Sequence, residues 1–203
     1  GTFVRDPGAA GGPELRTIGL VLAGLGATEV WDPLTRHIGQ AASALGITVL
    51  VNPNASPRDE VEAARGQAEW LLEQGVDGVL FAPLEAVAQR ETENRAICEL
   101  LTAAGVPVAL LDRDLAEFPG RSEFDVIGVD NARAGALIGR HLAERGLRRP
   151  ILVSYPDFPC TTDLRSAGCR WALGQAGIQL RHDWHVQGDP SDDGWGSQAL
   201  AAH

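Results

Sequence analysis

Short apolar runs alternate with segments of helical spacing along most of this 203-residue chain. Each run is apolar throughout instead of alternating with polar residues, which is typical of strands that are covered on both faces. We predict strands at residues 17–23, 47–53, 78–83, 107–112, 125–130, 150–156 and 184–189.

Helical spacing fills the intervals between these strands. In residues 58–75 the acidic side chains come early, apolar residues recur every three or four positions, and Gly75 stands where helices commonly end. The predicted helices span residues 32–46, 58–75, 89–105, 131–146 and 163–177. Because strand and helix alternate, the sequence predicts an α/β class with a doubly wound parallel sheet.

Several polar or aromatic residues follow the predicted strands. Trp31 comes after the first strand, and Asp112 and Arg113 come at the end of the fourth. Asp130 ends the fifth strand, and Arg165 stands two residues into the helix after the sixth. Ligands of doubly wound folds gather beyond the carboxyl ends of the strands, so we expect these side chains to share one rim.

The charge of the chain excludes some partners. The net charge is −10, and all 17 basic residues are arginine. Neutralising phosphates requires a concentrated basic surface, so the sequence does not favour direct binding to nucleic acid or to an anionic membrane. No apolar run approaches the ~20 residues of a membrane-spanning helix, and no pattern of a secretory leader is present.

Metal and disulfide chemistry is not indicated. Cys98, Cys160 and Cys169 are an odd number without CxxC spacing, which favours reduced thiols in a cytoplasmic protein. His182 and His185 stand three residues apart, but no third ligand accompanies them. We therefore predict no metal site.

The common nucleotide and hydrolase motifs are incomplete or absent. Gly24 and Gly26 begin a dinucleotide-binding pattern, but Glu29 occupies the third glycine position and residues 52–54 contain no acid. A P-loop needs a lysine, which the chain lacks, and GxSxG is also missing. A receiver domain would place an aspartate where Ala82 follows the third strand. We predict neither catalysis nor a cofactor.

The expected rim suits a sugar or another small polyol. Carboxylates accept hydrogen bonds from hydroxyl groups, and a guanidinium group donates to neighbouring oxygens. An indole such as that of Trp31 can cover an apolar C–H face.

Each of these residues also has an ordinary structural interpretation. Trp31 is a plain core residue in that view, and Asp112 with Arg113 is a surface pair. Asp130 is then the N-cap of the next helix, and Arg165 is a solvated charge. For each residue alone, both the ligand-binding and the structural interpretation remain open. The five residues taken together favour a polyol ligand.

Two long motifs resemble a known family. AGVPVALLDRDL (104–115) and FDVIGVDNARAGALIGRHLAERGLRRPILVSYP (124–156) are similar to the effector-binding module of LacI/GalR-type regulators and the related periplasmic sugar-binding proteins. The likeness continues through LRSAG (164–168) and covers residues 17 to about 199. It implies a type I periplasmic-binding-protein-like fold, with doubly wound parallel sheets in two lobes.

The resemblance also implies the ligand contacts. Asp112, Arg113, Asp130 and Arg165 fall on positions that contact ligand in the family, and Trp31 lies near the family's aromatic residue after the first strand.

The first residues add a second resemblance. GTFV (1–4) is similar to the closing wing strand of a GntR-type winged-helix domain, an arrangement known from arabinose-responsive repressors. We therefore expect residues 1–6 to be a winged-helix remnant and residues 7–16 a linker. Residues 17–147 are then the first lobe, and residues 148–203 a partial second lobe whose remaining strands lie outside this sequence.

These resemblances imply the sugar-sensing domain of a cytoplasmic transcriptional regulator. Ligand would close the lobes and alter the spacing of DNA-binding domains across a homodimer, with DNA contacted only through a domain outside this chain. The alternative is a periplasmic solute-binding protein of a sugar transporter. The upstream sequence, a winged helix or an exported leader, would distinguish the two.

Overall fold

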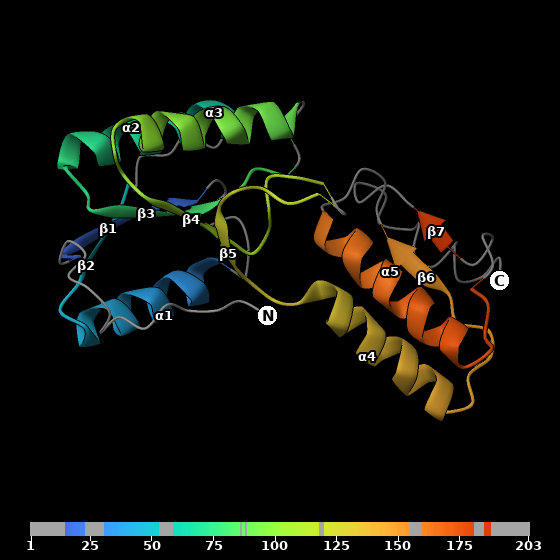
Figure 1. The fold of residues 1–203 in the computed structure, drawn as a ribbon. Helices are drawn as coiled ribbons and strands as arrows, with labels where there is room; N and C mark the ends of the chain where they lie inside the picture. The colour runs from blue at the N-terminus through green and yellow to red at the C-terminus, as the bar shows by residue number, and fades with distance from the viewer. Residues whose placement is uncertain are drawn as a thin grey trace. The chain divides into compact units, whose positions relative to one another are not determined.

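The computed structural model describes residues 15–22, 31–52, 59–85, 87, 89–117, 120–154, 160–180 and 185–187 (Figure 1). Two compact units divide the chain, one formed by Gly1–Ala82 with Glu93–Leu110 and the other by Pro83–Thr92 with Leu111–His203. Among the described residues, no helix is long and apolar enough to cross a membrane.

The strands and helices follow the predicted order. The strands are β1 (Thr17–Leu22), β2 (Thr48–Val51), β3 (Gly78–Ala82), β4 (Val108–Leu111), β5 (Asp125–Ile127), β6 (Leu152–Ser154) and β7 (His185–Gln187). The helices are α1 (Trp31–Ala44), α2 (Glu60–Gln74), α3 (Arg90–Ala103), α4 (Asn131–Glu144) and α5 (Cys160–Gln175). The strands are shorter than the apolar runs that predicted them, because the hydrogen-bonded ladder ends before the run does.

The predicted α/β class with parallel strands is confirmed. One sheet has the order β2-β1-β3-β4-β5, and β6 and β7 form a separate two-stranded sheet. The pairs β1–β2, β1–β3, β3–β4 and β6–β7 are parallel, with Ile18 opposite both Val49 and Gly78. The five-strand order is that of flavodoxin-like doubly wound folds.

The core of the first unit lies on both faces of β1 and β3. Helix α1 covers one face, and α2 and α3 cover the other (Figure 1). Leu20, Phe81 and Leu71 are completely buried there. Gly19 permits this packing, because a Cβ at that position would lie 2.6 Å from the methyl groups of Leu71.

The buried side-chain amide of Gln67 is hydrogen-bonded to Leu22, the last residue of β1. Gln67 of α2 is 3% exposed; its Oε1 accepts a hydrogen bond from the Leu22 N–H at 2.9 Å, and its Nε2 donates to the Leu22 carbonyl at 3.3 Å. The ladder between β1 and β2 ends earlier, at the pair Leu20 and Val51. Gln67 therefore takes the place of a strand neighbour for the last residue of β1.

Helices α4 and α5 of the second unit pack in direct contact. A Cβ at Gly135 of α4 would overlap the carbonyl oxygen of Arg165, and a Cβ at Gly168 of α5 would overlap that of Ala132. The two glycines thus allow the backbones to approach more closely than any larger residue would permit. This approach brings the N-terminal turns of the two helices together.

The predicted domain boundaries remain predictions. Residues 1–14, which include the expected winged-helix remnant and most of the linker, lie outside the described residues. The expected boundary between lobes at residues 147 and 148 would place α4 in the first lobe, whereas α4 packs on α5 within the second unit.

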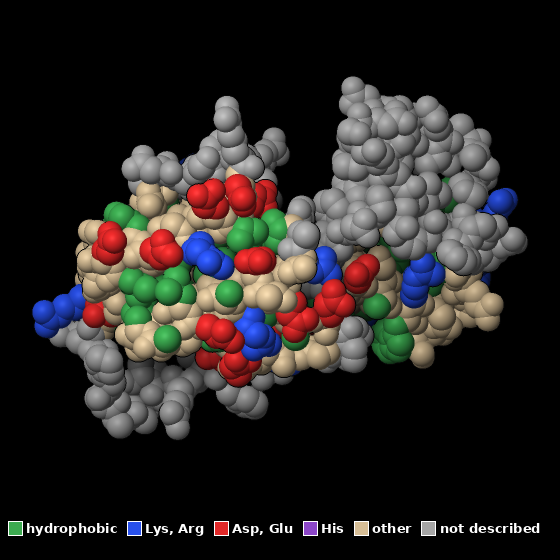
Figure 2. Space-filling model, turned by 90° about the horizontal axis from the view of Figure 1, so that it is seen from above, with side chains coloured by type: hydrophobic (Ala, Val, Ile, Leu, Met, Phe, Trp, Pro, Cys, Tyr) green, Lys and Arg blue, Asp and Glu red, His purple; other side chains and the backbone are tan. Residues whose placement is uncertain are grey.

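Acidic and basic side chains are interspersed on the face drawn in Figure 2. Among the described residues of that face, several arginines stand next to Asp or Glu, and the basic side chains form no continuous patch. The distribution agrees with the net charge of −10.

Candidate functional site

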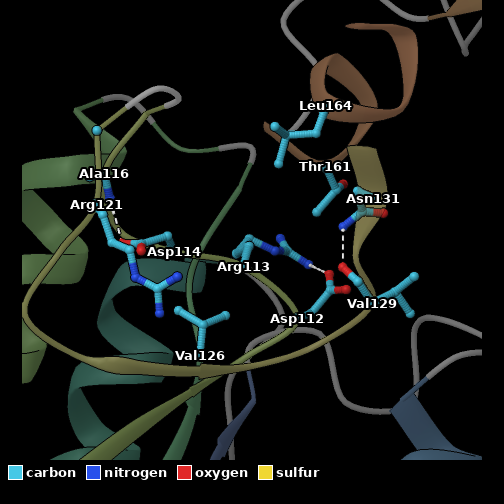
Figure 3. A pocket seen from close by; sticks show the side chains of 11 residues that line it. Asp112, Arg113, Asp114, Ala116, Arg121, Val126, Val129, Asn131, Thr161 and Leu164 are labelled. Carbon is cyan, nitrogen blue, oxygen red and sulfur yellow. Dashed lines mark hydrogen bonds and ion pairs between the residues drawn. The ribbon is translucent and has the colours of Figure 1, made fainter. Parts of the chain in front are cut away.

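A cavity of about 330 Å³ lies in the second unit, beside β5 and the segment that follows β4 (Figure 3). Its polar lining comes from the segment after β4 and from the first turns of α4 and α5. The side chains that line it include Asp112, Arg113, Asp114, Arg121, Asn131 and Thr161, with Val126, Val129 and Leu164 as apolar members.

The backbone at Asp112 has a left-handed conformation, with φ of 71°. Its N–H donates to the Ile127 carbonyl at 2.8 Å. Gly128, just after β5, lies against the same peptide, since a Cβ there would come within 2.7 Å of the Asp112 carbonyl oxygen. Aspartate tolerates the left-handed region better than most residues, and the contact with β5 holds the turn in place.

Arg113 is bonded to two carboxylates. Its Nη2 lies 2.7 Å from Asp112 Oδ2, and its Nη1 forms an ion pair with Glu85. Nη1 also donates to the Pro83 carbonyl at 3.3 Å. The Arg113 side chain is only 9% exposed, so these partners compensate the removal of its charge from water.

Burial raises the pKa of the Asp112 carboxyl above its ordinary value, and the positive charge of Arg165 opposes part of that increase. The interaction places Arg165 within electrostatic reach of the cavity.

Arg165 is held by Asn131. Its Nε donates to Asn131 Oδ1 at 2.6 Å, while Asn131 Nδ2 donates to the Val129 carbonyl at 3.1 Å. Asn131 is 4% exposed and lines the cavity. Asn131 was not among the predicted site residues, although it directly follows Asp130 in the quoted stretch of residues 124–156.

Asp130 caps helix α4. Its Oδ1 accepts a hydrogen bond from the Arg133 N–H at 2.9 Å, as the structural interpretation of this residue anticipated. Among the described residues, Asn131 and not Asp130 lines this corner of the cavity. A ligand contact by Asp130 remains a prediction.

Trp31 begins helix α1 in the first unit, where its side chain is partly buried. The structure thus brings together Asp112, Arg113 and Arg165 in the second unit and places Trp31 in the other. The role of Trp31 in ligand binding remains a prediction.

Four further polar residues were missed by the sequence analysis. Glu85 follows β3, so the rule that selected Asp112 also points to it. Asp114 accepts hydrogen bonds from the N–H groups of Ala116 and Ser122, each at 3.1 Å, and shapes the segment that carries Arg121. Thr161, in the first turn of α5, carries no signal of its own in the sequence.

No group of three potential metal ligands occurs in the part of the chain that the structure describes. His182 and the side chain of His185 lie outside that part, as does the side chain of Cys160. Cys98 and Cys169 are buried, and neither belongs to a disulfide. The described cavity is therefore built from hydrogen-bonding side chains and apolar walls.

Two solved regulator structures resemble this fold. The complex of the transcriptional regulator CelR with cellobiose is 26% identical, with a TM-score of 0.67 over 93% of this chain and 55% of that chain. The lac repressor dimer bound to operator and the anti-inducer ONPF is 25% identical, with a TM-score of 0.66 over 88% of this chain and 57% of that chain.

A curated relative is also a regulator. The HTH-type transcriptional repressor PurR of Erwinia tasmaniensis is 29% identical over 175 residues, which are 86% of this chain and 47% of the relative. The chain thus spans about half the length of this relative. The relatives and structures named here are transcriptional regulators.

These relatives correct one expectation. The chain was expected to belong to a GntR-type regulator similar to arabinose-responsive repressors, but the similarity leads to PurR and lac-type repressors, so the GntR assignment is wrong. That assignment rested on Gly1–Val4, which lies outside the described residues. Four residues are too short a pattern to identify a domain.

The family itself follows from a match to most of the described fold. A family model described as a periplasmic binding protein domain matches residues 18–149, which extend from β1 past the end of α4. The matched segment includes Asp112, Arg113 and Asn131 of the cavity. The chain therefore belongs to the periplasmic binding protein domain family.

Proposed function

We propose that this chain is the effector-binding module of a transcriptional regulator and that its cavity binds a small sugar-like effector. The observation that carries the proposal is the mixed lining of the 330 Å³ cavity. Asp112 supplies oxygens that accept, Arg113 supplies N–H groups that donate, and the Thr161 hydroxyl can do both. A sugar needs this mixture, because each of its hydroxyl groups both donates and accepts.

The apolar part of the lining supports the same ligand class. Val126, Val129 and Leu164 line the cavity beside the polar groups. Such side chains suit the C–H face of a sugar ring, while the polar groups fix its orientation. Arg165 joins the site through Asn131, and Trp31 and Asp130 are further contacts in this proposal.

The regulatory step is a change in the arrangement of the lobes. Ligand that binds one arrangement more tightly increases its population. In a homodimer, this change is coupled to the affinity of helix-turn-helix domains for DNA. The named relatives support this scheme, since PurR is a repressor and the lac repressor structure is a dimer on its operator.

In this scheme, another part of the protein binds DNA. The protein acts in the cytoplasm. A net charge of −10 supports this scheme, because an acidic module is poorly suited to bind DNA and is left to bind the ligand. A periplasmic solute-binding protein would share the cavity, but the relatives named above are transcriptional regulators and favour the regulator.

The test begins with the thermal stability of the full-length protein. The panel contains ribose, xylose, glucose, galactose, cellobiose, the available sugar phosphates, adenine, guanine and NAD. Ligand that binds the native state raises Tm, and we expect a sugar to do so in the wild type and not in Arg165→Ala or Asp112→Asn. Arg65→Ala, on α2 of the first unit, is the control that keeps the response.

Operator binding then tests the regulatory half of the proposal. The same sugar should change the affinity of the full-length protein for its operator in the wild type and leave it unchanged in Arg165→Ala. A response to adenine, guanine or NAD alone would contradict the sugar proposal. An operator affinity that no bound ligand changes would contradict the proposal that the protein is a ligand-controlled regulator.

A further inference from the structure

The guanidinium group in the cavity already holds two carboxylates. Arg113 Nη2 lies 2.7 Å from Asp112, and Nη1 is paired with Glu85 (Figure 3 shows the Asp112 contact). An anionic ligand group that approaches Arg113 must displace one of these partners or add a third negative charge beside them. Either outcome disfavours a phosphate or carboxylate at this position.

The charges around the cavity cancel. Asp112, Asp114, Arg113 and Arg121 line it, Glu85 is bound to Arg113, and Arg165 acts on Asp112. These are three carboxylates and three guanidinium groups, so the site has no net charge when all are ionised. Neutralising one of the carboxylates leaves an excess of positive charge that would attract an anion.

Glu85 and Asp112 differ in their relation to the ligand space. Asp112 lines the cavity, whereas the residues described as lining it do not include Glu85. Glu85 therefore acts on the cavity through Arg113. Its own side chain is 30% exposed, compared with 9% for that of Arg113, so it can be changed without opening a buried core.

We infer that Glu85 is a specificity-determining residue that makes the effector site select uncharged sugars over their phosphorylated or carboxylated counterparts. The inference rests on the proposed function, because it concerns the same cavity. Glu85 compensates the charge of Arg113, which leaves the Arg113 N–H groups as hydrogen-bond donors without a net attraction for anions.

The test is Glu85→Gln in the full-length protein, which keeps the shape of the side chain and removes its charge. The probes are ribose with ribose 5-phosphate and glucose with glucose 6-phosphate, and the measurement is Kd by titration calorimetry. The wild type should prefer the uncharged member. In the variant we expect the phosphorylated member to bind about tenfold tighter, with the Kd of the uncharged sugar within about threefold of the wild-type value.

Salt dependence separates a charge effect from a change of shape. The gain in E85Q should shrink as ionic strength rises, because salt screens the newly uncompensated Arg113. Glu85→Asp, which keeps the charge, should restore the preference for the uncharged sugar.

Glu93→Gln is the matched control. Glu93 pairs with Arg65 at 3.7 Å, and its side chain is 29% exposed, close to the 30% of Glu85. It lies in the first unit, and its substitution removes the same charge from the protein. Both Kd values should stay at the wild-type level in this variant.

The outcomes are distinct. If the wild type binds a sugar but prefers its phosphorylated form, or if E85Q gains no affinity for that form, the inference on Glu85 is wrong while the proposed function stands. If the wild type binds neither ribose nor glucose nor their phosphates, and no sugar of the larger panel raises Tm, both are overturned.

Discussion

Arg165 Nε donates a 2.6 Å hydrogen bond to Asn131 Oδ1 and thereby connects the second turn of α5 to the first residue of α4. The two residues are 34 positions apart in the chain. Glycines on both helices permit the close approach of the backbones that this bond requires. The packing of α4 on α5 therefore decides where the guanidinium group lies relative to the cavity.

The first prediction concerns that hydrogen bond. Asn131→Ala removes the acceptor of Arg165 and leaves its guanidinium group without a fixed position. We expect effector affinity to fall about tenfold, a loss typical of one hydrogen bond to a charged group. Titration calorimetry measures this loss, and Thr102→Ala, on α3 of the first unit, should leave Kd unchanged. An unchanged Kd in N131A would remove Asn131 from the site.

The second prediction concerns the helix contact. Alanine normally stabilises a helix relative to glycine by about 0.5–1 kcal/mol. At Gly168 the added Cβ would overlap the Ala132 carbonyl oxygen, so Gly168→Ala should instead lower the free energy of unfolding by about 1–3 kcal/mol. Gly66→Ala on α2 is the control, since its Cβ meets nothing within 4 Å, and it should stabilise. Urea denaturation of both variants checks the opposite signs.

The third prediction concerns the end of β1. Gln67→Leu leaves the buried N–H and C=O groups of Leu22 without their amide partner. We expect a loss of about 1–3 kcal/mol for each group in the free energy of unfolding. Gln74→Leu, at the exposed end of α2, should change it by less than about 0.5 kcal/mol. Equal effects in the two variants would contradict the role assigned to Gln67.

The fourth prediction concerns Asp77. Its Oδ2 accepts hydrogen bonds from the N–H groups of Arg16 and Thr17, and these bonds lower the pKa of its carboxyl below the ordinary value of 3.8. A lowered pKa stabilises the folded state above pH 3.8, and this contribution disappears as pH falls through the folded pKa. Asp77→Asn should therefore flatten the acid limb of a plot of Tm against pH.

The fifth prediction has the opposite sign. Burial raises the pKa of Asp112 above 3.8, so the folded state holds this proton more tightly than the unfolded chain does. Ionising Asp112 then costs stability, which decreases as pH rises from 3.8 through the folded pKa. Over that pH interval, the Tm of Asp112→Asn should rise relative to the Tm of the wild type. A wild-type Tm that rises there relative to D112N would contradict the burial of the carboxyl.

Element order and class could be predicted because they depend on local pattern. Residues 58–75 carried start and stop signals, and the structure bears them out with Asp59 as N-cap and Gly75 at φ of 68° after α2. The ends of strands were less predictable, since the apolar run of residues 125–130 extends beyond the three residues of β5.

The candidate site could be predicted only in part. Asp112 and Arg113 follow a strand, so a general rule finds them. Asn131 and Thr161 enter the cavity because α4 and α5 approach each other. That approach depends on tertiary contacts of Gly135 with the Arg165 backbone and of Gly168 with the Ala132 backbone. For Asp130, the sequence allowed both a cap and a ligand contact, and only the bond to the Arg133 N–H identified the cap.

The contact between Gly128 and the Asp112 peptide has a consequence for engineering this module. Any side chain at position 128 would push against the turn that carries the Asp112 carboxylate. A library meant to change the recognised effector should therefore vary the side chains at 85, 131 and 161 and keep Gly128 constant. Substitutions at 128 would mostly yield variants in which the Asp112 carboxylate is displaced from the cavity, whichever residue is introduced.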